Sequence, residues 1–235
     1  MISIRHVSVS RGGRRVLSSV TGDLPQIGLL ALVGPNGSGK STFLESLSGL
    51  APISSGQLID SAAGLKLSAN GLKHRCAYLH QRLVLPAQTS PREYLECIHR
   101  WARFRHTSQV SESNSDASSG TIMSLENLES RNLELFSWGQ RRVVALAGVV
   151  ATRKPILLLD EPYSGLHPSL ANQVTDLLKQ LCARRLVVLA EHDLQLVEVL
   201  SEVAEVWIFR DGRIAAKIPA GRFVRSSILE FFDGV

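Results

Sequence analysis

A glycine-rich segment at residues 34–42, Gly-Pro-Asn-Gly-Ser-Gly-Lys-Ser-Thr, constrains the fold of this chain more than any other feature. Its glycines lack a Cβ, so the backbone can bend sharply and approach a bound anion closely. Successive backbone N–H groups of such a loop point inward and form a nest for phosphate. In this pattern Lys40 reaches the β- and γ-phosphates, Ser41 binds Mg²⁺ and Thr42 meets the α-phosphate. The segment therefore predicts a site for a nucleoside triphosphate, the alternative being an ordinary turn rich in Gly and Ser.

The residues on both sides of this glycine-rich loop have the pattern that a phosphate-binding loop requires. Residues 27–33 form a short apolar run of strand length. Residues 43–50 repeat apolar side chains at helical spacing, namely Phe43, Leu44, Leu47 and Leu50. The loop should thus follow a buried strand and open a helix whose positive end attracts phosphate. The residues expected to contact the nucleotide are Gly34, Pro35, Asn36, Gly37, Ser38, Gly39, Lys40, Ser41 and Thr42.

A second motif, Ile-Leu-Leu-Leu-Asp-Glu-Pro at 156–162, predicts a buried parallel strand that ends in two acids. Open α/β sheets bind their ligands at this carboxyl end of the strands. Asp160 is placed to bind the magnesium shell through water, and Glu161 is placed to act on the attacking water as general base. Alone, the acid pair could equally cap the next helix. Together with the glycine-rich loop, it indicates nucleotide hydrolysis.

Composition and charge limit the remaining possibilities. A chain of 235 residues that is 44% hydrophobic suits one compact domain, or a core with an inserted subdomain. The net charge of +5 is small and scattered, so no nucleic-acid partner is expected. The three cysteines, Cys76, Cys97 and Cys182, form no CxxC pair, which argues against a disulfide framework or a zinc site. No apolar run approaches the roughly 18 residues of a membrane span, and the start lacks a signal-peptide core. We expect a cytoplasmic protein; if it serves a membrane, it does so through a partner.

Patterns along the chain predict antiparallel strands, then α/β units, a helical insertion, and α/β units again. Strands are expected at 2–9, 15–24, 76–80, 155–160, 186–190, 205–210 and 213–218. Helices are expected at 91–104, 122–135, 140–153, 168–183, 194–202 and 224–232. Residues 52–75 give weak strand and turn signals, whereas the serine-rich stretch 106–121 predicts a flexible surface loop. Asp211-Gly212 predicts a hairpin turn.

Two of the expected helices have notable side chains. The helix at 91–104 places Tyr94, Leu95, Ile98 and Trp101 along one face. The helix at 140–153 is strongly apolar and carries Arg141, Arg142 and Arg153.

In order and spacing, these motifs resemble the ATP-binding cassette ATPases, the nucleotide-binding subunits of ABC transporters, over essentially the whole chain. The family's signature, Leu-Ser-Gly-Gly-Gln, corresponds to Phe-Ser-Trp-Gly-Gln at 136–140. Gln81 matches the family's glutamine loop, and His192 matches its switch histidine. The loop after Glu161 corresponds to Ser164, Gly165, Leu166 and His167. Taken singly, Gln81 could be a surface side chain, Ser137 a helix N-cap and His192 a satisfied polar residue.

The resemblance implies an α/β fold with a P-loop NTPase (RecA-like) core. The core and an antiparallel β subdomain would occupy 1–85 and 154–235, and an α-helical subdomain with the signature would be inserted at 86–153. Two copies, or two paired cassettes, would sandwich each ATP between the glycine-rich loop of one and the signature of the other. The signature residues are Ser137, Trp138, Gly139 and Gln140, and the loop 164–167 would cross the dimer interface.

The resemblance also implies roles for single residues. Ser41, Gln81 and Asp160 would surround magnesium. His192 would contact the γ-phosphate and position water with the catalytic Glu161, while Lys40 completes the catalytic set.

The activity implied is that of an ATPase at the inner face of the cell membrane, driving a separate integral membrane permease docked in a groove near 82–105. The single cassette favours a bacterial assembly, and the brief helical insertion favours an importer of metal chelates or vitamins. The alternatives are an exporter subunit, a soluble cassette ATPase acting on DNA or ribosomes, and a scaffold that binds ATP without hydrolysing it.

Three residues depart from the family pattern. Arg11 stands where an aromatic residue usually stacks on adenine, so its guanidinium could stack instead, or Arg11 faces solvent and apolar contacts such as Val16 hold the base. Trp138 replaces a glycine, which costs roughly 1–2 kcal/mol if its φ is positive and little otherwise. His167 replaces a common aspartate, either as a pH-sensitive contact or as a tolerated polar substitution.

Overall fold

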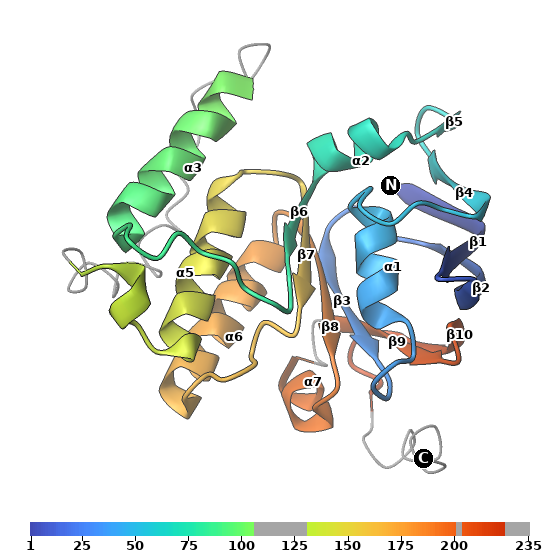
Figure 1. Cartoon of the computed structure of the whole chain (residues 1–235). Coiled ribbons are helices and arrows are strands. Elements are labelled where there is room, and N and C mark those ends of the chain that lie inside the picture. The colour runs from blue at the N-terminus through green and yellow to red at the C-terminus, as the bar shows by residue number, and fades with distance from the viewer. Residues whose placement is uncertain (106–130, 201–203, 224–235) are drawn as a thin grey trace.

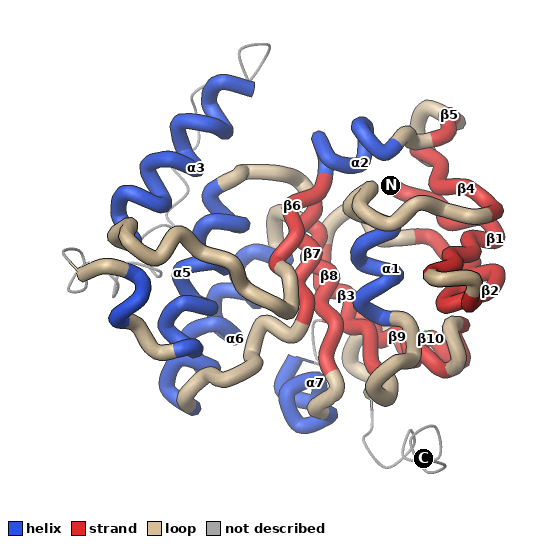
Figure 2. Tube along the Cα trace, viewed as in Figure 1, coloured by secondary structure: helices blue, strands red, loops and turns tan. Residues whose placement is uncertain are grey.

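The computed structural model describes residues 1–105, 131–200 and 204–223. Its strands are β1 Ile2–Arg11, β2 Arg14–Asp23, β3 Gly28–Val33, β4 Ser55–Asp60, β5 Leu65–Lys66, β6 Cys76–Leu79, β7 Ile156–Asp160, β8 Leu186–Glu191, β9 Ala204–Arg210 and β10 Arg213–Ile218. Its α-helices are α1 Lys40–Leu47, α2 Ala69–Arg75, α3 Pro91–Arg105, α5 Trp138–Ala151, α6 Pro168–Cys182 and α7 Leu194–Leu200, and Leu133–Leu135 form a 3₁₀ turn. The strands form two sheets beside α1, with α3, α5 and α6 gathered at the other side of the molecule (Figures 1 and 2).

The larger sheet has the strand order β10-β9-β3-β8-β7-β6, and all its pairs are parallel except that of β10 with β9. Successive side chains of a strand point to opposite faces, so a strand that is apolar throughout needs cover on both. In β3, Leu29, Ala31 and Val33 pack in one core with residues of α5 and α6. Leu30 and Leu32 pack in a second core with α1 and the antiparallel strands. Because β3 has a core on each face, its sequence is apolar along its length instead of alternating with polar residues.

The smaller sheet is antiparallel, with the order β2-β1-β4-β5. Its core-facing side chains, including the fully buried Ile4 and Val9, pack with α1 and one face of the larger sheet, whereas Leu65 of β5 is exposed. The predicted α/β fold is therefore confirmed; β1 and β2 precede the glycine-rich loop as expected, and β4 and β5, which follow it, complete the antiparallel sheet. The boundaries proposed for the subdomains stay a prediction.

The β9–β10 hairpin braces the glycine-rich loop. Asp211 and Gly212 both have positive φ, 49° and 72°, as a two-residue hairpin turn requires. The Gly212 N–H donates to the Ser38 carbonyl at 3.0 Å, and the Gly212 carbonyl accepts from the Ser18 N–H at 2.9 Å. A Cβ on Gly212 would lie 2.2 Å from the Val16 carbonyl oxygen, so only glycine fits this contact. The hairpin predicted from the sequence thus also fixes the position of the loop.

Three details differ from the sequence predictions. Gly49, with φ 74°, ends α1 before Leu50, so Leu50 is 52% exposed instead of sharing the apolar face. Trp101 is 47% exposed because the C-terminal end of α3 extends away from α5 (Figure 1). Helix α2 was not predicted within 52–75; Ser68 caps it by accepting a hydrogen bond from the Gly71 N–H at 3.1 Å.

Some predictions fall on residues that the structure does not describe. These are the loop at 106–121, most of the helix at 122–135 and the C-terminal helix at 224–232. Within the described ranges, no helix is both long and apolar enough to cross a bilayer.

Candidate functional site

The glycine-rich loop leaves the carboxyl end of β3 and leads directly into α1. Gly34 has φ 155°, and a Cβ there would lie 2.1 Å from the Phe209 carbonyl oxygen. Gly39, at φ 105°, is the N-cap of α1 and offers no side chain to its first N–H groups. The Ser38 hydroxyl is buried and has no hydrogen-bond partner among the described residues. The helix start and this hydroxyl therefore suit an anionic ligand that would satisfy them.

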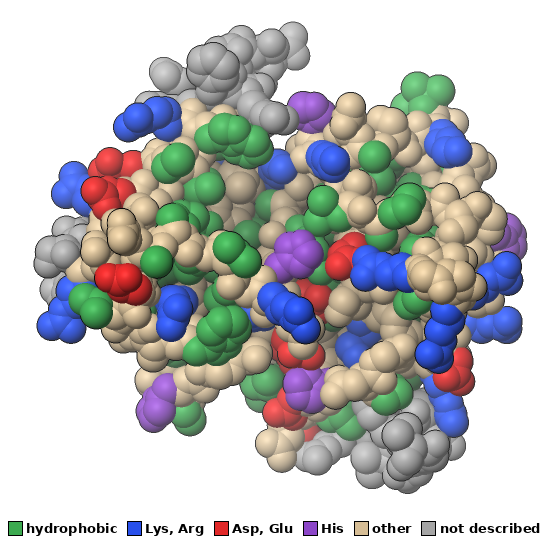
Figure 3. Space-filling model, in the orientation of Figure 1, with side chains coloured by type: hydrophobic (Ala, Val, Ile, Leu, Met, Phe, Trp, Pro, Cys, Tyr) green, Lys and Arg blue, Asp and Glu red, His purple; other side chains and the backbone are tan. Residues whose placement is uncertain are grey.

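A cavity of about 380 Å³ opens at this helix start. It is lined by residues from separate segments of the chain: Val16, Asn36, Gly37, Ser38, Gly39, Lys40, Ser41, Thr42, Gln81, Glu161 and His192. Acidic, basic and histidine side chains gather around the hollow in the middle of this face (Figure 3). The structure thus brings together most of the nucleotide-binding residues expected from the sequence; Asp160 lies just beneath, bonded to Ser41.

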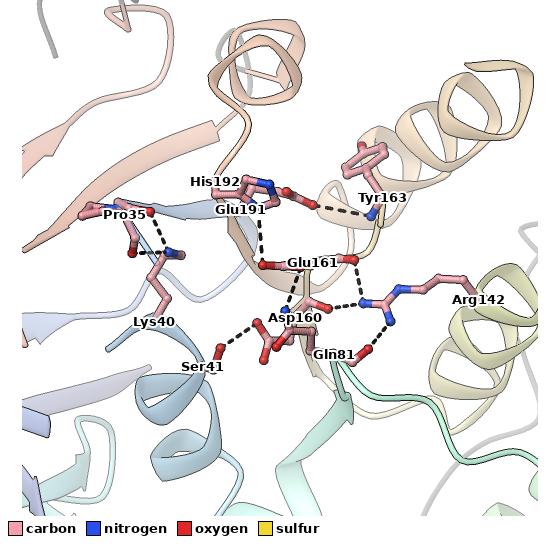
Figure 4. A network of polar contacts seen from close by, with 11 residues as sticks. Pro35, Lys40, Ser41, Gln81, Arg142, Asp160, Glu161, Tyr163, Glu191 and His192 are labelled. Atoms are coloured by element: carbon pink, nitrogen blue, oxygen red, sulfur yellow. Dashed lines mark hydrogen bonds and ion pairs between the residues drawn. The ribbon is translucent and has the colours of Figure 1, made fainter. Parts of the chain in front are cut away.

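Lys40 is 7% exposed, and its Nζ donates to the carbonyl oxygens of Gly34 at 2.7 Å and Pro35 at 3.1 Å (Figure 4). Burial lowers the pKa of Lys40, and the carboxylates of Glu161 and Asp160 oppose that shift. A phosphate chain in the cavity would give this buried ammonium a negatively charged partner.

Asp160 and Ser41 form a pair of oxygen donors beneath the cavity. Asp160 is 2% exposed; its Oδ1 accepts from the Ser41 hydroxyl at 3.1 Å and its Oδ2 from the Tyr78 hydroxyl at 3.0 Å. Burial raises the pKa of Asp160, while these two hydrogen bonds lower it. A hydroxyl and a carboxylate side by side are the hard ligands that Mg²⁺ prefers, so the residues present fit that ion.

Glu161, Gln81 and His192 meet at the mouth of the cavity, each just past the carboxyl end of a neighbouring strand. The Glu161 Oε2 accepts from Gln81 Nε2 at 2.9 Å, and its Oε1 lies 3.3 Å from His192 Nδ1 (Figure 4). Glu161 has φ 49°, a left-handed conformation that is unusual for a residue with a side chain. The order of strands β6, β7 and β8 thus assembles three residues that are far apart in the sequence.

Three residues of the site were not assigned by sequence reasoning. Tyr78 bonds Asp160, as described above. Arg142 is fully buried and donates to the backbone carbonyls of Gln81 and Glu161. Glu191 is 2% exposed, and burial raises its pKa to about 7. A charged residue inside an apolar helix or at the end of an apolar strand is the signal that could have pointed to the last two.

The signature segment, residues 137–140, begins α5 with a capping box. Ser137 Oγ accepts from the Gln140 N–H at 3.2 Å, and Gln140 Oε1 accepts from the Ser137 N–H at 2.9 Å. Trp138 is the first residue of α5 and is not among the residues with positive φ, so its replacement of glycine carries no left-handed strain. None of the signature side chains lines the cavity.

The interface loop, residues 164–167, packs directly against the signature segment. A Cβ on Gly139 would lie 2.5 Å from the Gly165 carbonyl oxygen, and a Cβ on Gly165 would lie 2.5 Å from the Trp138 ring. His167 is the N-cap of α6, with Nδ1 accepting from the Ser169 N–H at 3.4 Å. This is the same local task that an aspartate performs at a helix start.

Arg11 does not reach the cavity in this structure. Its guanidinium is bonded to the Glu45 carboxylate on α1, and Val16 is the member of the expected pair that lines the cavity. Stacking of Arg11 on the base stays a prediction.

Comparison with known proteins adds to this geometry. A family model described as ABC transporter matches residues 17–164. The chain is 32% identical to the phosphonates import ATP-binding protein PhnC 2 of Rhodopseudomonas palustris, covering 95% of this chain and 81% of that protein. It is 34% identical to the hemin import ATP-binding protein HmuV of Streptomyces coelicolor, and the match covers 96% of this chain and 80% of that protein. It is 33% identical to the cytochrome c biogenesis ATP-binding export protein CcmA of Paracoccus denitrificans, and the match covers 94% of this chain and 96% of that protein.

A solved structure, the dimeric post-hydrolysis state of the ATP-binding cassette MJ0796 bound to ADP and Pi, superposes with a TM-score of 0.76. It is 21% identical, and the match covers 95% of this chain and all of that one. At this identity the likeness shows the fold, that of a P-loop cassette.

Proposed function

Because this chain belongs to the ABC transporter family as an ATP-binding subunit with ATPase activity, we propose that it drives a membrane permease with ATP bound in the cavity at the start of α1. The observation that carries the proposal is the convergence of Lys40, the Ser41–Asp160 pair and the Glu161–Gln81–His192 cluster on that cavity. Each of these groups matches one need of phosphoryl transfer: charge, metal and water.

Binding rests on the loop and on Lys40. Backbone N–H groups at the α1 start would surround the β- and γ-phosphates, and Lys40 would exchange its carbonyl partners for phosphate oxygens. Magnesium would be held by Ser41, with Asp160 acting through water and Gln81 at the edge of the shell. When bound, the ion neutralises the charge that develops on the phosphates.

Hydrolysis requires a water placed in line with the γ-phosphate. Glu161 would accept a proton from that water, while His192 and Gln81 orient the carboxylate and the phosphate. These groups act through position and charge, which supply most of the rate in phosphoryl transfer.

The active form would be a pair of cassettes. The signature segment and the interface loop lie together at the start of α5, outside the cavity of their own chain. In a head-to-tail pair, Ser137 and the Gly139 N–H would meet the γ-phosphate held by the partner chain. That the MJ0796 cassette bound to ADP and Pi is dimeric supports the pairing of cassettes.

The partner would be an integral membrane permease that holds the cassette at the cytoplasmic face of the membrane. Gln81 leads into an apolar segment that includes Val84, which is 94% exposed, and we place the docking groove at 82–105. Import is favoured because PhnC 2 and HmuV are named import proteins, and a metal chelate or vitamin stays the favoured class because HmuV is named for hemin, a metal chelate. Export stays the second candidate because CcmA is named an export protein.

The test is the Glu161→Gln variant. We expect ATP binding to persist while turnover falls by roughly 10²–10⁴-fold, the usual contribution of a general base. Fluorescent ATP binding and steady-state phosphate release measure the two quantities, and Glu134→Gln, which changes an exposed glutamate, is the matched control. Phosphate release by Glu161→Gln at the parent's rate would show that Glu161 is not the base.

A further inference from the structure

Arg142 lies at the centre of a set of hydrogen bonds to backbone carbonyls just behind the cavity. It is 0% exposed, on α5 within two turns of Ser137. Its Nη1 donates to the carbonyl oxygens of Gln81 at 2.6 Å and His80 at 3.4 Å. Its Nη2 donates to those of Glu161 at 2.6 Å and Asp160 (Figure 4). One side chain therefore joins the two segments that carry the cavity's glutamine and its catalytic carboxylate.

A buried guanidinium is costly unless its N–H groups find acceptors. Here the acceptors are carbonyls, and Nε is left without a partner among the described residues. Burial lowers the pKa of Arg142, while the carboxylates of Asp160, Glu161 and Glu191 oppose that shift, so the group stays charged. The positive charge of Arg142 thus acts on the same three carboxylates as the ammonium of Lys40.

The conformation of Glu161 needs such support. A left-handed φ of 49° is unfavourable for a residue with a Cβ and persists only where its surroundings hold it. Arg142 bonds the carbonyl of this residue and that of Asp160 before it. The same guanidinium bonds the carbonyl of Gln81, whose side chain holds the Glu161 carboxylate at 2.9 Å.

We propose that Arg142 is a positioning residue that fixes Gln81 and Glu161 as one unit with helix α5. It does not line the cavity, so it acts through those two residues and touches neither nucleotide nor metal. Helix α5 also begins with the signature segment. A movement of α5 on pairing would therefore be transmitted directly to the catalytic carboxylate. The inference rests on the proposed function, in which Glu161 and Gln81 serve ATP hydrolysis.

The test compares Arg142→Lys and Arg142→Gln with Arg141→Gln. Arg141 is the adjacent arginine on the same helix, and its Nε donates to the Phe136 carbonyl instead of to the site. We expect kcat to fall by roughly 10-fold in Arg142→Lys and up to about 100-fold in Arg142→Gln, as for a misplacement near 1 Å. KM and the Kd for a fluorescent ATP analogue should stay within about 3-fold. Arg141→Gln should keep the parent's kcat.

Hydrogen exchange of the intact chain gives a readout that does not depend on turnover. We expect the amides at 81–82 and 161–163 to exchange faster in Arg142→Lys than in the parent, whereas the amides of α1 should exchange at the parent's rate. If the parent chain hydrolyses no ATP, the proposed function is wrong, but the hydrogen-exchange comparison still tests whether Arg142 holds the two segments. The inference is overturned if the Lys variant shows the parent's kcat and exchange, or if its kcat, ATP affinity and Tm all fall together, as in a general loss of stability. If Arg142→Gln does not fold, Arg142→Lys alone decides.

Discussion

At the scale of single residues, the site depends on carboxylates held away from water. Glu191 is the clearest case, because it is 2% exposed and burial raises its pKa to about 7. Its Oε1 accepts a long hydrogen bond of 3.4 Å from the Tyr163 N–H, and the charge of Glu161 adds repulsion. The folded chain therefore binds a proton at Glu191 more tightly than the unfolded chain does.

This shift predicts a pH-dependent effect of Glu191→Gln on stability. A raised carboxyl pKa destabilises the fold increasingly as pH rises from the unfolded value, near 4.5, to about 7, and by a constant amount above. Removing the charge should raise the free energy of unfolding by about 1–3 kcal/mol at pH 8 and by almost nothing at pH 4.5. Urea unfolding at the two pH values measures the difference, with Glu134→Gln as control. An equal effect at both pH values would contradict the raised pKa.

The residues of the site that the sequence indicates are those whose chemistry is local. Lys40 and Asp160 stand in continuous motifs beside their own strands, so spacing alone predicts where they lie. Arg142 and Tyr78 could not be assigned in this way, because their partners are carbonyls and a carboxylate that only the folded sheet brings near. Arg11 shows the converse, since its pairing with Glu45 depends on a contact between β1 and α1 that no local pattern contains.

At the scale of elements, turns and helix ends place the glycine-rich loop. The hairpin prediction at Asp211-Gly212 is confirmed because its residues suit positive φ whatever surrounds them. Helix α2 escaped prediction because its single buried residue, Leu72, gives no apolar face. The prediction that the apolar face of α1 includes Leu50 was wrong, because Gly49, in the left-handed region, ends the helix before it.

The hairpin's brace on the loop leads to a prediction for Gly212→Ala. The new Cβ would lie 2.2 Å from the Val16 carbonyl oxygen, at φ 72°, and would push the hairpin away from Ser38. We expect a loss of stability above the roughly 1–2 kcal/mol of left-handed strain, together with weaker ATP binding. Gly221→Ala is the matched control, since its φ is 73° and its Cβ would meet no atom within 4 Å.

Thermal unfolding and fluorescent ATP titration of both alanine variants separate the effect of left-handed backbone strain from the effect of the lost contact between the hairpin and the glycine-rich loop. Gly221→Ala should lose only the strain and keep the parent's ATP affinity. Equal losses in the two variants would show that the hairpin contact does not position the loop.

At the scale of the whole molecule, the larger sheet has a core on each face. The phosphate-binding helix α1 and the signature helix α5 therefore pack against opposite faces of the same sheet. Helix α1 packs in one core and α5 in the other. The cavity is lined by Lys40, Glu161 and His192, while the signature segment lies outside it and packs against the interface loop. This arrangement fits the proposal that two chains pair, with the cavity of one completed by the signature segment of the other.

The measurement that tests this account most directly is light scattering of Glu161→Gln with Mg²⁺ and ATP. With hydrolysis blocked, ATP should hold two chains together, so the mass should double with ATP and return to one chain with ADP. Ser137→Arg, which adds a large side chain at the exposed start of α5, should bind ATP and stay single. Bound ATP without any pairing in Glu161→Gln would contradict the account.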